Sequence, residues 1–138
     1  MTTESRGATA PTAPTAPASS DDAAIRATID DYYLGWYDAD GDRMARALHP
    51  DLAKRGWLRA TSGGWFVDHD TMATMVEMAA AGRGRRSDPD ARAYTVAVND
   101  VYGDIAAAVV RAVPYVDFLH LVRTPAGWRI LNALWCPR

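Results

Sequence analysis

The stretch YVDFLHLVRTPAGWRILNALW, residues 115–135, decides the fold. Two extended apolar segments flank the loop TPAG at 124–127, and a short loop with proline and glycine between such segments is typical of a β-hairpin. The sequence therefore predicts one strand over 114–123, beginning at the proline, and a second strand over 128–135.

Two further strands are expected before this hairpin. Residues 94–101 are rich in β-branched side chains, and residues 105–113 are apolar with a run of small alanines. The tripeptide Tyr-Gly-Asp at 102–104 separates them and is typical of a tight turn. The second half of the chain is therefore predicted to be a meander of four strands.

The first half of the chain is expected to begin with two helices. Apolar residues recur at helical spacing over 22–38, which predicts an amphipathic helix. A second, shorter helix is expected to start at Asp42, as its N-cap, and to stop at Pro50. The residue before a proline disfavours the helical conformation, which is why the helix should end there.

A hairpin and a third helix complete the predicted elements. Aromatic segments around the turn signal at 61–64 predict a β-hairpin over 52–67. A helix is expected over 69–81, with Asp68 as its N-cap and Gly82 as its C-terminal stop. Helices segregated from a run of strands indicate the α+β class, with helices on one face of an antiparallel sheet.

Composition divides the chain into a tail and one domain. Residues 1–19 are rich in Ala, Thr and Pro and are predicted to be disordered, and residues 20–138 are predicted to form a single domain. The net charge of −2 and the lack of a basic face argue against nucleic acid as a partner. No apolar run reaches the ~18 residues of a membrane span.

Two residue counts bear on the source and the compartment. A single cysteine excludes an internal disulfide and fits a reducing cytoplasm, which is the location we expect. One lysine, Lys54, among many arginines suggests a GC-rich, bacterial genome.

The order of the predicted elements and several motifs resemble the NTF2-like superfamily, which includes the SnoaL-like and ketosteroid-isomerase-like proteins. Within it, the chain is most similar to the "putative lumazine-binding" group, over residues 22–136. The motifs that carry the resemblance are YLGW at 33–36, GD at 41–42, ALHPDL at 47–52, VYGDIA at 101–106 and the opening stretch.

The resemblance implies a cone-shaped, curved antiparallel sheet with three helices on its concave face. It also implies a pocket between the helices and the sheet, and a homodimer. Members of the superfamily include isomerases, cyclases, dehydratases, epoxide hydrolases and non-catalytic ligand-binding proteins, so this fold leaves the activity open.

Three residues are candidates for catalysis. A tyrosine near the position of Tyr33 donates to a developing oxyanion in ketosteroid-isomerase-like members; a core tyrosine is the alternative. The resemblance places His49 at the pocket rim, where it could act as a base or as a hydrogen-bond donor, although a histidine at a helix C-terminus is favourable without any substrate. Asp117 is either a base with a raised pKa or the partner of an arginine such as Arg55 or Arg129.

Asp117 and His120 should lie on opposite faces of their strand, because side chains alternate along a strand. One face is expected to line the cone and the other to lie in a dimer interface. The remaining candidates for substrate binding share an ability to form flat walls or to pair with a carboxylate: Tyr32, Arg55, Trp57, His120 and Trp135. The histidines are scattered without the spacing of metal ligands, so neither a metal nor a cofactor is expected.

The expected function is that of a pocket protein for a small apolar or cyclic molecule. If it catalyses, the reaction should be a cofactor-independent proton transfer, as in an isomerase, dehydratase or cyclase. The alternatives are a non-catalytic ligand-binding or accessory dimer, and an interaction module whose cone is filled by its own tryptophans.

Overall fold

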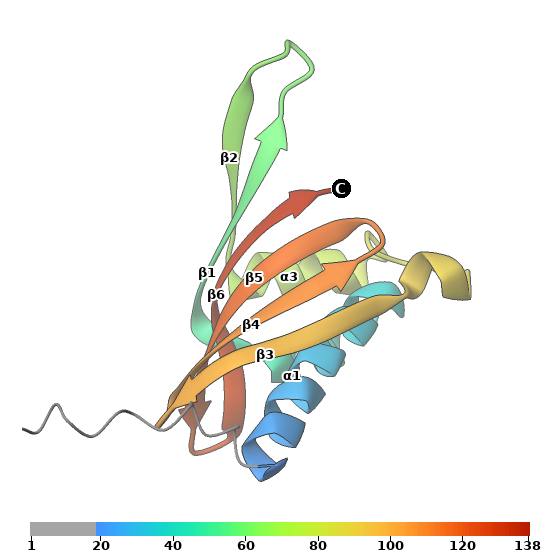
Figure 1. Ribbon diagram of the computed structural model, residues 1–138. Coiled ribbons are helices and arrows are strands. Elements are labelled where there is room, and N and C mark those ends of the chain that lie inside the picture. The colour runs from blue at the N-terminus through green and yellow to red at the C-terminus, as the bar shows by residue number, and fades with distance from the viewer. Residues whose placement is uncertain (1–18) are drawn as a thin grey trace, which may run out of the picture.

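The computed structural model describes residues 19–138, and these form three α-helices and a six-stranded sheet (Figure 1). The tail predicted to be disordered lies outside the described residues, apart from Ser19, where the first helix begins. The elements are α1 (Ser19–Tyr37), α2 (Gly41–Ala47), β1 (Leu48–Arg59), β2 (Trp65–Asp70), α3 (Met72–Ala80), the short 3-10 helix η2 (Pro89–Arg92), β3 (Tyr94–Tyr102), β4 (Ile105–Ala112), β5 (Tyr115–Thr124) and β6 (Gly127–Pro137).

The sheet is curved and does not close, and its strand order is β2-β1-β6-β5-β4-β3. Every neighbouring pair runs antiparallel except β1 and β6, which pair in parallel. The antiparallel pairing expected from the sequence is thus found at every neighbouring pair but this one. Parallel neighbours need a long connection, and the chain from β2 through α3 to β5 supplies it between β1 and β6.

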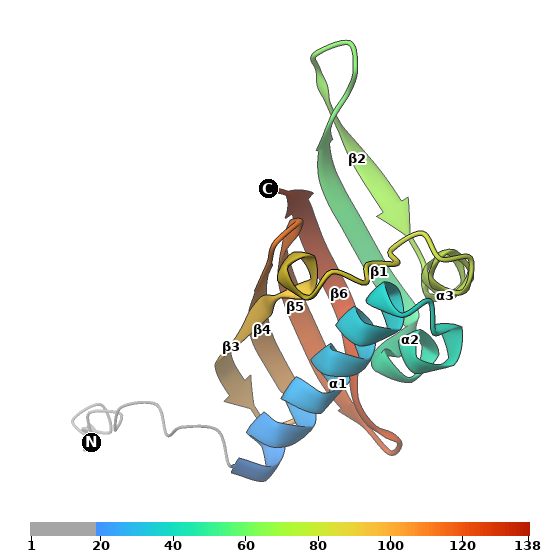
Figure 2. The same cartoon turned by 90° about the vertical axis from the view of Figure 1, so that its right-hand side faces the viewer.

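The helices cover one face of the sheet, and α1 lies across that face (Figure 2). Residues one and two turns apart on α1 point into the core, and Ile25, Ile29 and Tyr33 are at most 2% exposed. Asp21 and Asp22 lie in its first turn, where carboxylates interact favourably with the helix dipole. The predicted α+β architecture is confirmed.

The start and end of α2 differ from the prediction. Asp40, and not Asp42, is the N-cap, and its carboxylate accepts from the backbone N–H of Arg43 at 3.0 Å. The helix ends at Ala47, ahead of Pro50, because Leu48 already pairs with Ile130 of β6. The sheet, and not the proline, ends this helix.

The start of α3 also differs from the prediction. Asp68 is not its N-cap, since β2 continues to Asp70 and pairs there with Lys54 of β1. Thr71 caps the helix instead, in a reciprocal arrangement with Thr74. Strand pairing thus places two aspartates beside Lys54. Gly82 follows the helix with φ of 81°, as expected of a C-terminal stop.

Candidate functional site

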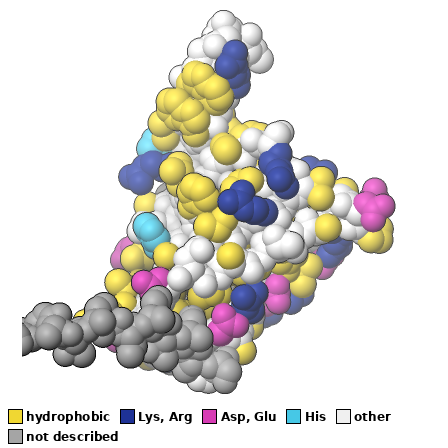
Figure 3. All heavy atoms as spheres, in the orientation of Figure 1, with side chains coloured by type: hydrophobic (Ala, Val, Ile, Leu, Met, Phe, Trp, Pro, Cys, Tyr) yellow, Lys and Arg dark blue, Asp and Glu magenta, His cyan; other side chains and the backbone are white. Residues whose placement is uncertain are grey.

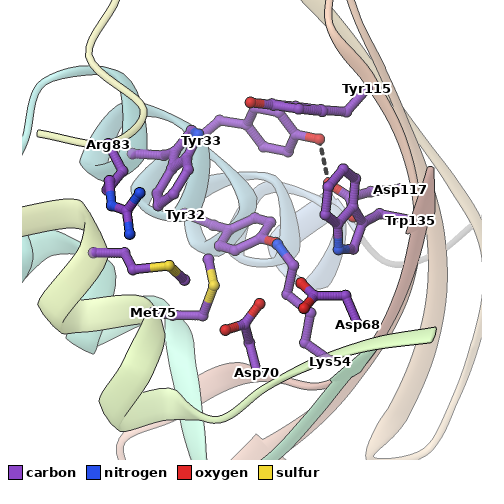
Figure 4. Close-up of a pocket in the computed structure, with 12 residues that line it drawn as sticks. Tyr32, Tyr33, Lys54, Asp68, Asp70, Met75, Arg83, Tyr115, Asp117 and Trp135 are labelled. Carbon is purple, nitrogen blue, oxygen red and sulfur yellow. Dashed lines mark hydrogen bonds between the residues drawn. The ribbon is translucent and has the colours of Figure 1, made fainter. Parts of the chain in front are cut away.

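A cavity of about 280 Å³ lies between the helices and the concave face of the sheet (Figure 4). Its walls combine aromatic and methionine side chains with charged groups from β1, β2, β5 and the segment after α3. The lining residues are Tyr32, Tyr33, Trp36, Lys54, Asp68, Asp70, Met75, Met78, Arg83, Tyr115, Asp117 and Trp135. Its volume approaches the lower end of the roughly 300–1,000 Å³ typical of ligand sites.

Asp117 and Tyr33 form one polar pair of this cavity. Asp117 projects from β5 and is 3% exposed, and its Oδ2 accepts a hydrogen bond from the Tyr33 hydroxyl of α1 (Figure 4). Its other oxygen, Oδ1, is buried and has no hydrogen-bond partner among residues 19–138. A carboxylate oxygen is thus left as an acceptor in an apolar setting.

The electrostatics of this pair follow from burial. Burial raises the pKa of the Asp117 carboxyl, and the charge of Lys54 and the hydrogen bond from Tyr33 oppose that rise. Burial and the nearby Asp117 carboxylate raise the pKa of the Tyr33 phenol far above its ordinary value. Tyr33 therefore keeps its proton at ordinary pH, and Asp117 holds a proton to a higher pH than a solvated aspartate does.

Lys54 and Tyr32 form the second polar pair. Lys54 is 9% exposed, and its ammonium donates to the Tyr32 hydroxyl. Its Nζ lies 4.9 Å from the Tyr32 ring centroid and 5.4 Å from that of Trp135. Burial lowers the pKa of Lys54, against the opposing effect of Asp117, Asp70 and, to a smaller extent, Asp68.

Trp135 reaches the cavity because of two local features. The register of β5 with β6 shifts between Asn132 and Ile130, so that Leu131 forms a bulge and the following side chains change face. Trp135 then lies over Gly56 of β1, where a Cβ atom would be 2.8 Å from the indole. The indole Nε1 is buried without a hydrogen-bond partner among the described residues.

Acidic and basic groups lie at the edge of the cavity. Asp70 accepts from the Thr74 hydroxyl at 3.1 Å, and burial raises the pKa of its carboxyl. Asp68 is half-buried on the same strand, and Arg83 is exposed beyond α3. Figure 4 shows both aspartates on the side where Lys54 enters the cavity.

The structure brings together part of the predicted site. Tyr32, Tyr33, Asp117 and Trp135 all line the cavity. The prediction that Asp117 and His120 lie on opposite faces is confirmed, because His120 is exposed on the outer face, 3.4 Å from the amide of Asn132.

Like His120, three further predicted site residues lie outside the cavity lining. His49 is outside the cavity lining, and its Nδ1 accepts from the backbone N–H of Asp51 at 2.9 Å. Arg55 and Trp57 are exposed on the outer face, where Trp57 stacks on Trp65 at 5.4 Å between ring centroids. Along β1, Arg55 and Trp57 alternate with Leu52, Lys54 and Gly56, which lie on the inner, buried face of the strand.

The proposed arginine partners of Asp117 were also wrong. Arg55 points outward. The guanidinium of Arg129 donates to the backbone carbonyls of Trp128 and Ala126. The sequence prediction missed Lys54, Asp68 and Asp70; the alternation of Leu52, Lys54 and Gly56 was the one signal that could have identified the lysine.

Two kinds of feature are absent from residues 19–138. No cluster of three His, Cys, Asp or Glu side chains in this part of the chain is arranged to hold a metal ion. Within the same residues, every helix is too short or too polar to traverse a bilayer.

The fold and the cavity define the class of protein. Three helices on the concave face of a curved, open sheet are shared with solved NTF2-like and cystatin-like structures. The chain belongs to the family described as "Putative lumazine-binding", whose model matches residues 20–136. Among curated proteins, none matches this sequence.

Solved structures resemble this chain in fold at low identity. An NTF2-like protein of unknown function from Silicibacter pomeroyi is 20% identical, with a TM-score of 0.66, over 87% of this chain and 98% of its own. One from Methylobacillus flagellatus is 17% identical, with a TM-score of 0.67, over 91% and 98%. One from Rhodospirillum rubrum, of unknown function in nutrient uptake, is 21% identical, with a TM-score of 0.63, over 83% and 98%.

Proposed function

We propose that the cavity binds a small, mostly apolar cyclic molecule and that Asp117 moves a proton on it without a cofactor. The observation that carries this proposal is the buried, unpartnered Oδ1 of Asp117 in an aromatic-walled cavity. Such an oxygen is costly to bury alone, and a ligand that donates to it or yields a proton to it relieves that cost.

The neighbouring groups suit the charge that proton removal creates. A base that takes a proton from carbon beside a carbonyl leaves negative charge on the carbonyl oxygen, and hydrogen-bond donors must stabilise it. Tyr32 and Lys54 are donors in the same cavity as Asp117. Isomerisation, dehydration and cyclisation all use this proton transfer, so we assign the class of step and not the product.

A non-catalytic binding function is the second candidate. The family description refers to lumazine, a flat bicyclic molecule with N–H donors and carbonyl acceptors. The free oxygen of Asp117 can accept from such an N–H group, the amine of Lys54 can donate to such a carbonyl, and Trp135 offers a flat surface for the rings. Lumazine is therefore the first binding probe.

One experiment separates these candidates. Cyclohexanone and 2-cyclohexenone are incubated with the protein in D₂O, and exchange of the protons beside the carbonyl is followed by NMR. We expect exchange above the buffer rate, reduced about 10²-fold or more in Asp117→Asn. The matched control is His49→Asn, outside the cavity, which should leave exchange unchanged.

The outcomes have distinct meanings. Saturable quenching of tryptophan fluorescence by lumazine or by either ketone, without exchange, would favour the binding protein over the enzyme. Absence of both binding and exchange would contradict the proposal and favour a purely structural module.

We also propose a cytoplasmic homodimer formed through the outer face of the sheet. Phe118 and Leu134 are paired neighbours on β5 and β6, and they are 52% and 53% exposed. Figure 3 shows hydrophobic side chains on the β1–β2 hairpin and over this face, beside arginines and histidines. Exposed apolar side chains that are contiguous across strands favour association with a second copy.

A further inference from the structure

Lys54 is chemically distinct within this chain. The sequence contains 15 lysines and arginines in total, and Lys54 is the one lysine, so 15 − 1 leaves fourteen arginines. Arginine keeps its proton at any ordinary pH, whereas lysine can become a neutral amine when it is buried. The side chain able to act as an amine nucleophile is therefore the one that lines the cavity.

The surroundings of Lys54 suit a reactive amine better than a structural ion pair. Among the described residues, no carboxylate lies within 4.0 Å of its ammonium. Its contacts are the Tyr32 hydroxyl and the faces of Tyr32 and Trp135. An aromatic, largely dehydrated setting favours the uncharged form of an amine.

The charged and titratable groups that face Lys54 come from β2, β5, α1 and the segment after α3. Asp117 on β5 and Asp68 and Asp70 on β2 favour the ammonium, whereas burial outweighs them and lowers the pKa of Lys54. Tyr32 and Tyr33 of α1 are neutral at ordinary pH, and Arg83, beyond α3, is exposed at the edge of the cavity.

We propose that Lys54 forms an imine with a small aldehyde or ketone that enters this cavity. This inference rests on the proposed ligand pocket and adds the chemical class of the ligand and a covalent step to it. Desolvated lysines are effective nucleophiles toward carbonyl carbon. Tyr32 is the hydroxyl that contacts the amine.

The step is a condensation that needs no oxidant or reductant. The lone pair of the Lys54 nitrogen attacks the carbonyl carbon, a C–N bond forms, and the electron pair of the C=O bond moves to oxygen. That oxygen takes up a proton from Tyr32 and a second proton that the nitrogen releases, and it leaves as water. The nitrogen gives its other proton back to Tyr32 as the C=N bond forms, so that amine and carbonyl become imine and water, and the C=N bond joins the ligand to the chain.

The imine is tested by reductive trapping on the full chain. The protein is incubated with benzaldehyde and sodium cyanoborohydride at pH 7, and the modified peptides are identified by mass spectrometry. Because the α-amino group is the one other primary amine, it serves as an internal comparison. We expect one benzyl group on the Lys54 peptide, formed severalfold faster than at the α-amino group and severalfold faster than at Lys54 in guanidinium-denatured protein.

Trapping at the α-amino group with Lys54 unmodified would overturn the imine proposal. A Lys54 rate equal to that of the denatured chain would overturn it as well. The parallel probe is benzyl alcohol, which has the same ring and no carbonyl, and whose binding is followed by quenching of tryptophan fluorescence. Benzyl alcohol that binds without benzaldehyde being trapped refutes the imine alone, whereas failure of both contradicts the pocket itself. Both measurements use the unaltered protein, so neither depends on a variant that folds.

Discussion

The hydroxyl of Tyr33 in α1 donates a hydrogen bond to the carboxylate of Asp117 in β5, 84 positions away in the sequence. This hydrogen bond joins the first helix to an inner strand of the sheet, in the wall of the cavity. It satisfies one oxygen of the buried carboxylate and leaves the other free. The same contact therefore supports the fold and presents an acceptor to a ligand.

Removing the hydroxyl should destabilise the protein. In Tyr33→Phe the Asp117 carboxylate loses its hydrogen-bond donor, and an unsatisfied buried group costs about 1–3 kcal/mol. We expect a loss of this size in the free energy of unfolding, measured by urea denaturation at pH 7. The matched control is Tyr102→Phe, since Tyr102 is 82% exposed, and it should change stability little. An equal effect of the two substitutions would contradict the role of the contact.

Asp117 should make stability depend on pH in a defined direction. Its folded pKa is raised above 3.8, so the folded state binds the proton more tightly than the unfolded state does. The resulting stabilisation is fully present below pH 3.8 and is lost as the pH rises through the folded pKa. The stability of the native protein relative to Asp117→Asn should therefore fall as the pH rises from about 4 toward neutrality.

The measurement is the difference in the free energy of unfolding between the two proteins across this range. Asn has a similar shape and does not titrate, so the contributions of other groups largely cancel in the difference. A difference that stays constant, or that grows in favour of the native protein as the pH rises, would refute a raised pKa at Asp117.

Gly56 should be required for the position of Trp135. A Cβ atom at residue 56 would lie 2.8 Å from the indole, so Gly56→Ala forces the tryptophan to move. Overpacking of this kind costs about 1–3 kcal/mol. We expect reduced stability together with a changed tryptophan emission spectrum. Gly64→Ala, in the β1–β2 turn with nothing within 4 Å, should leave the spectrum unchanged.

The proposed dimer should depend on Phe118. A charge at the centre of the outer face, as in Phe118→Asp, would be buried on association, and loss of a central aromatic contact typically costs about 2 kcal/mol or more. We expect a dimer for the unaltered protein and a monomer for this variant by sedimentation velocity at the same concentration. Tyr102→Ser, at the β3–β4 turn, should remain a dimer. A monomeric unaltered protein would refute the proposal.

The sequence was sufficient to predict which side chains face the core wherever a helix or strand has a regular, uninterrupted pattern of apolar residues. The apolar spacing of α1 predicted its buried stripe, and the alternation along β5 predicted that Asp117 and His120 face opposite sides. Tyr33 could be placed near Asp117 only through the resemblance to known folds, because no local pattern relates residues so far apart.

The sequence was insufficient where pairing between distant strands decides which way a side chain points or where a strand ends. On β1 the outward face carries Trp57, which stacks on Trp65 in the projecting hairpin (Figure 1). Because Trp57 is apolar, the sequence suggested that its side of the strand faces the pocket. Lys54, on the opposite side, was therefore overlooked. Asp68 has the chemistry of a helix cap, but its pairing with Gly56 keeps it in a strand. Trp135, expected as a flat wall of the pocket, does line the cavity, although its direction depends on the bulge at Leu131.

A crystallographic screen of small cyclic ketones and aromatic fragments tests the central proposal, the ligand pocket, most directly. If the cavity is that pocket, fragments will lie in it against Trp135, with a polar atom within hydrogen-bond distance of Asp117 Oδ1 or Lys54 Nζ. If the cavity stays empty while fragments bind the outer face of the sheet, the proposed function is wrong.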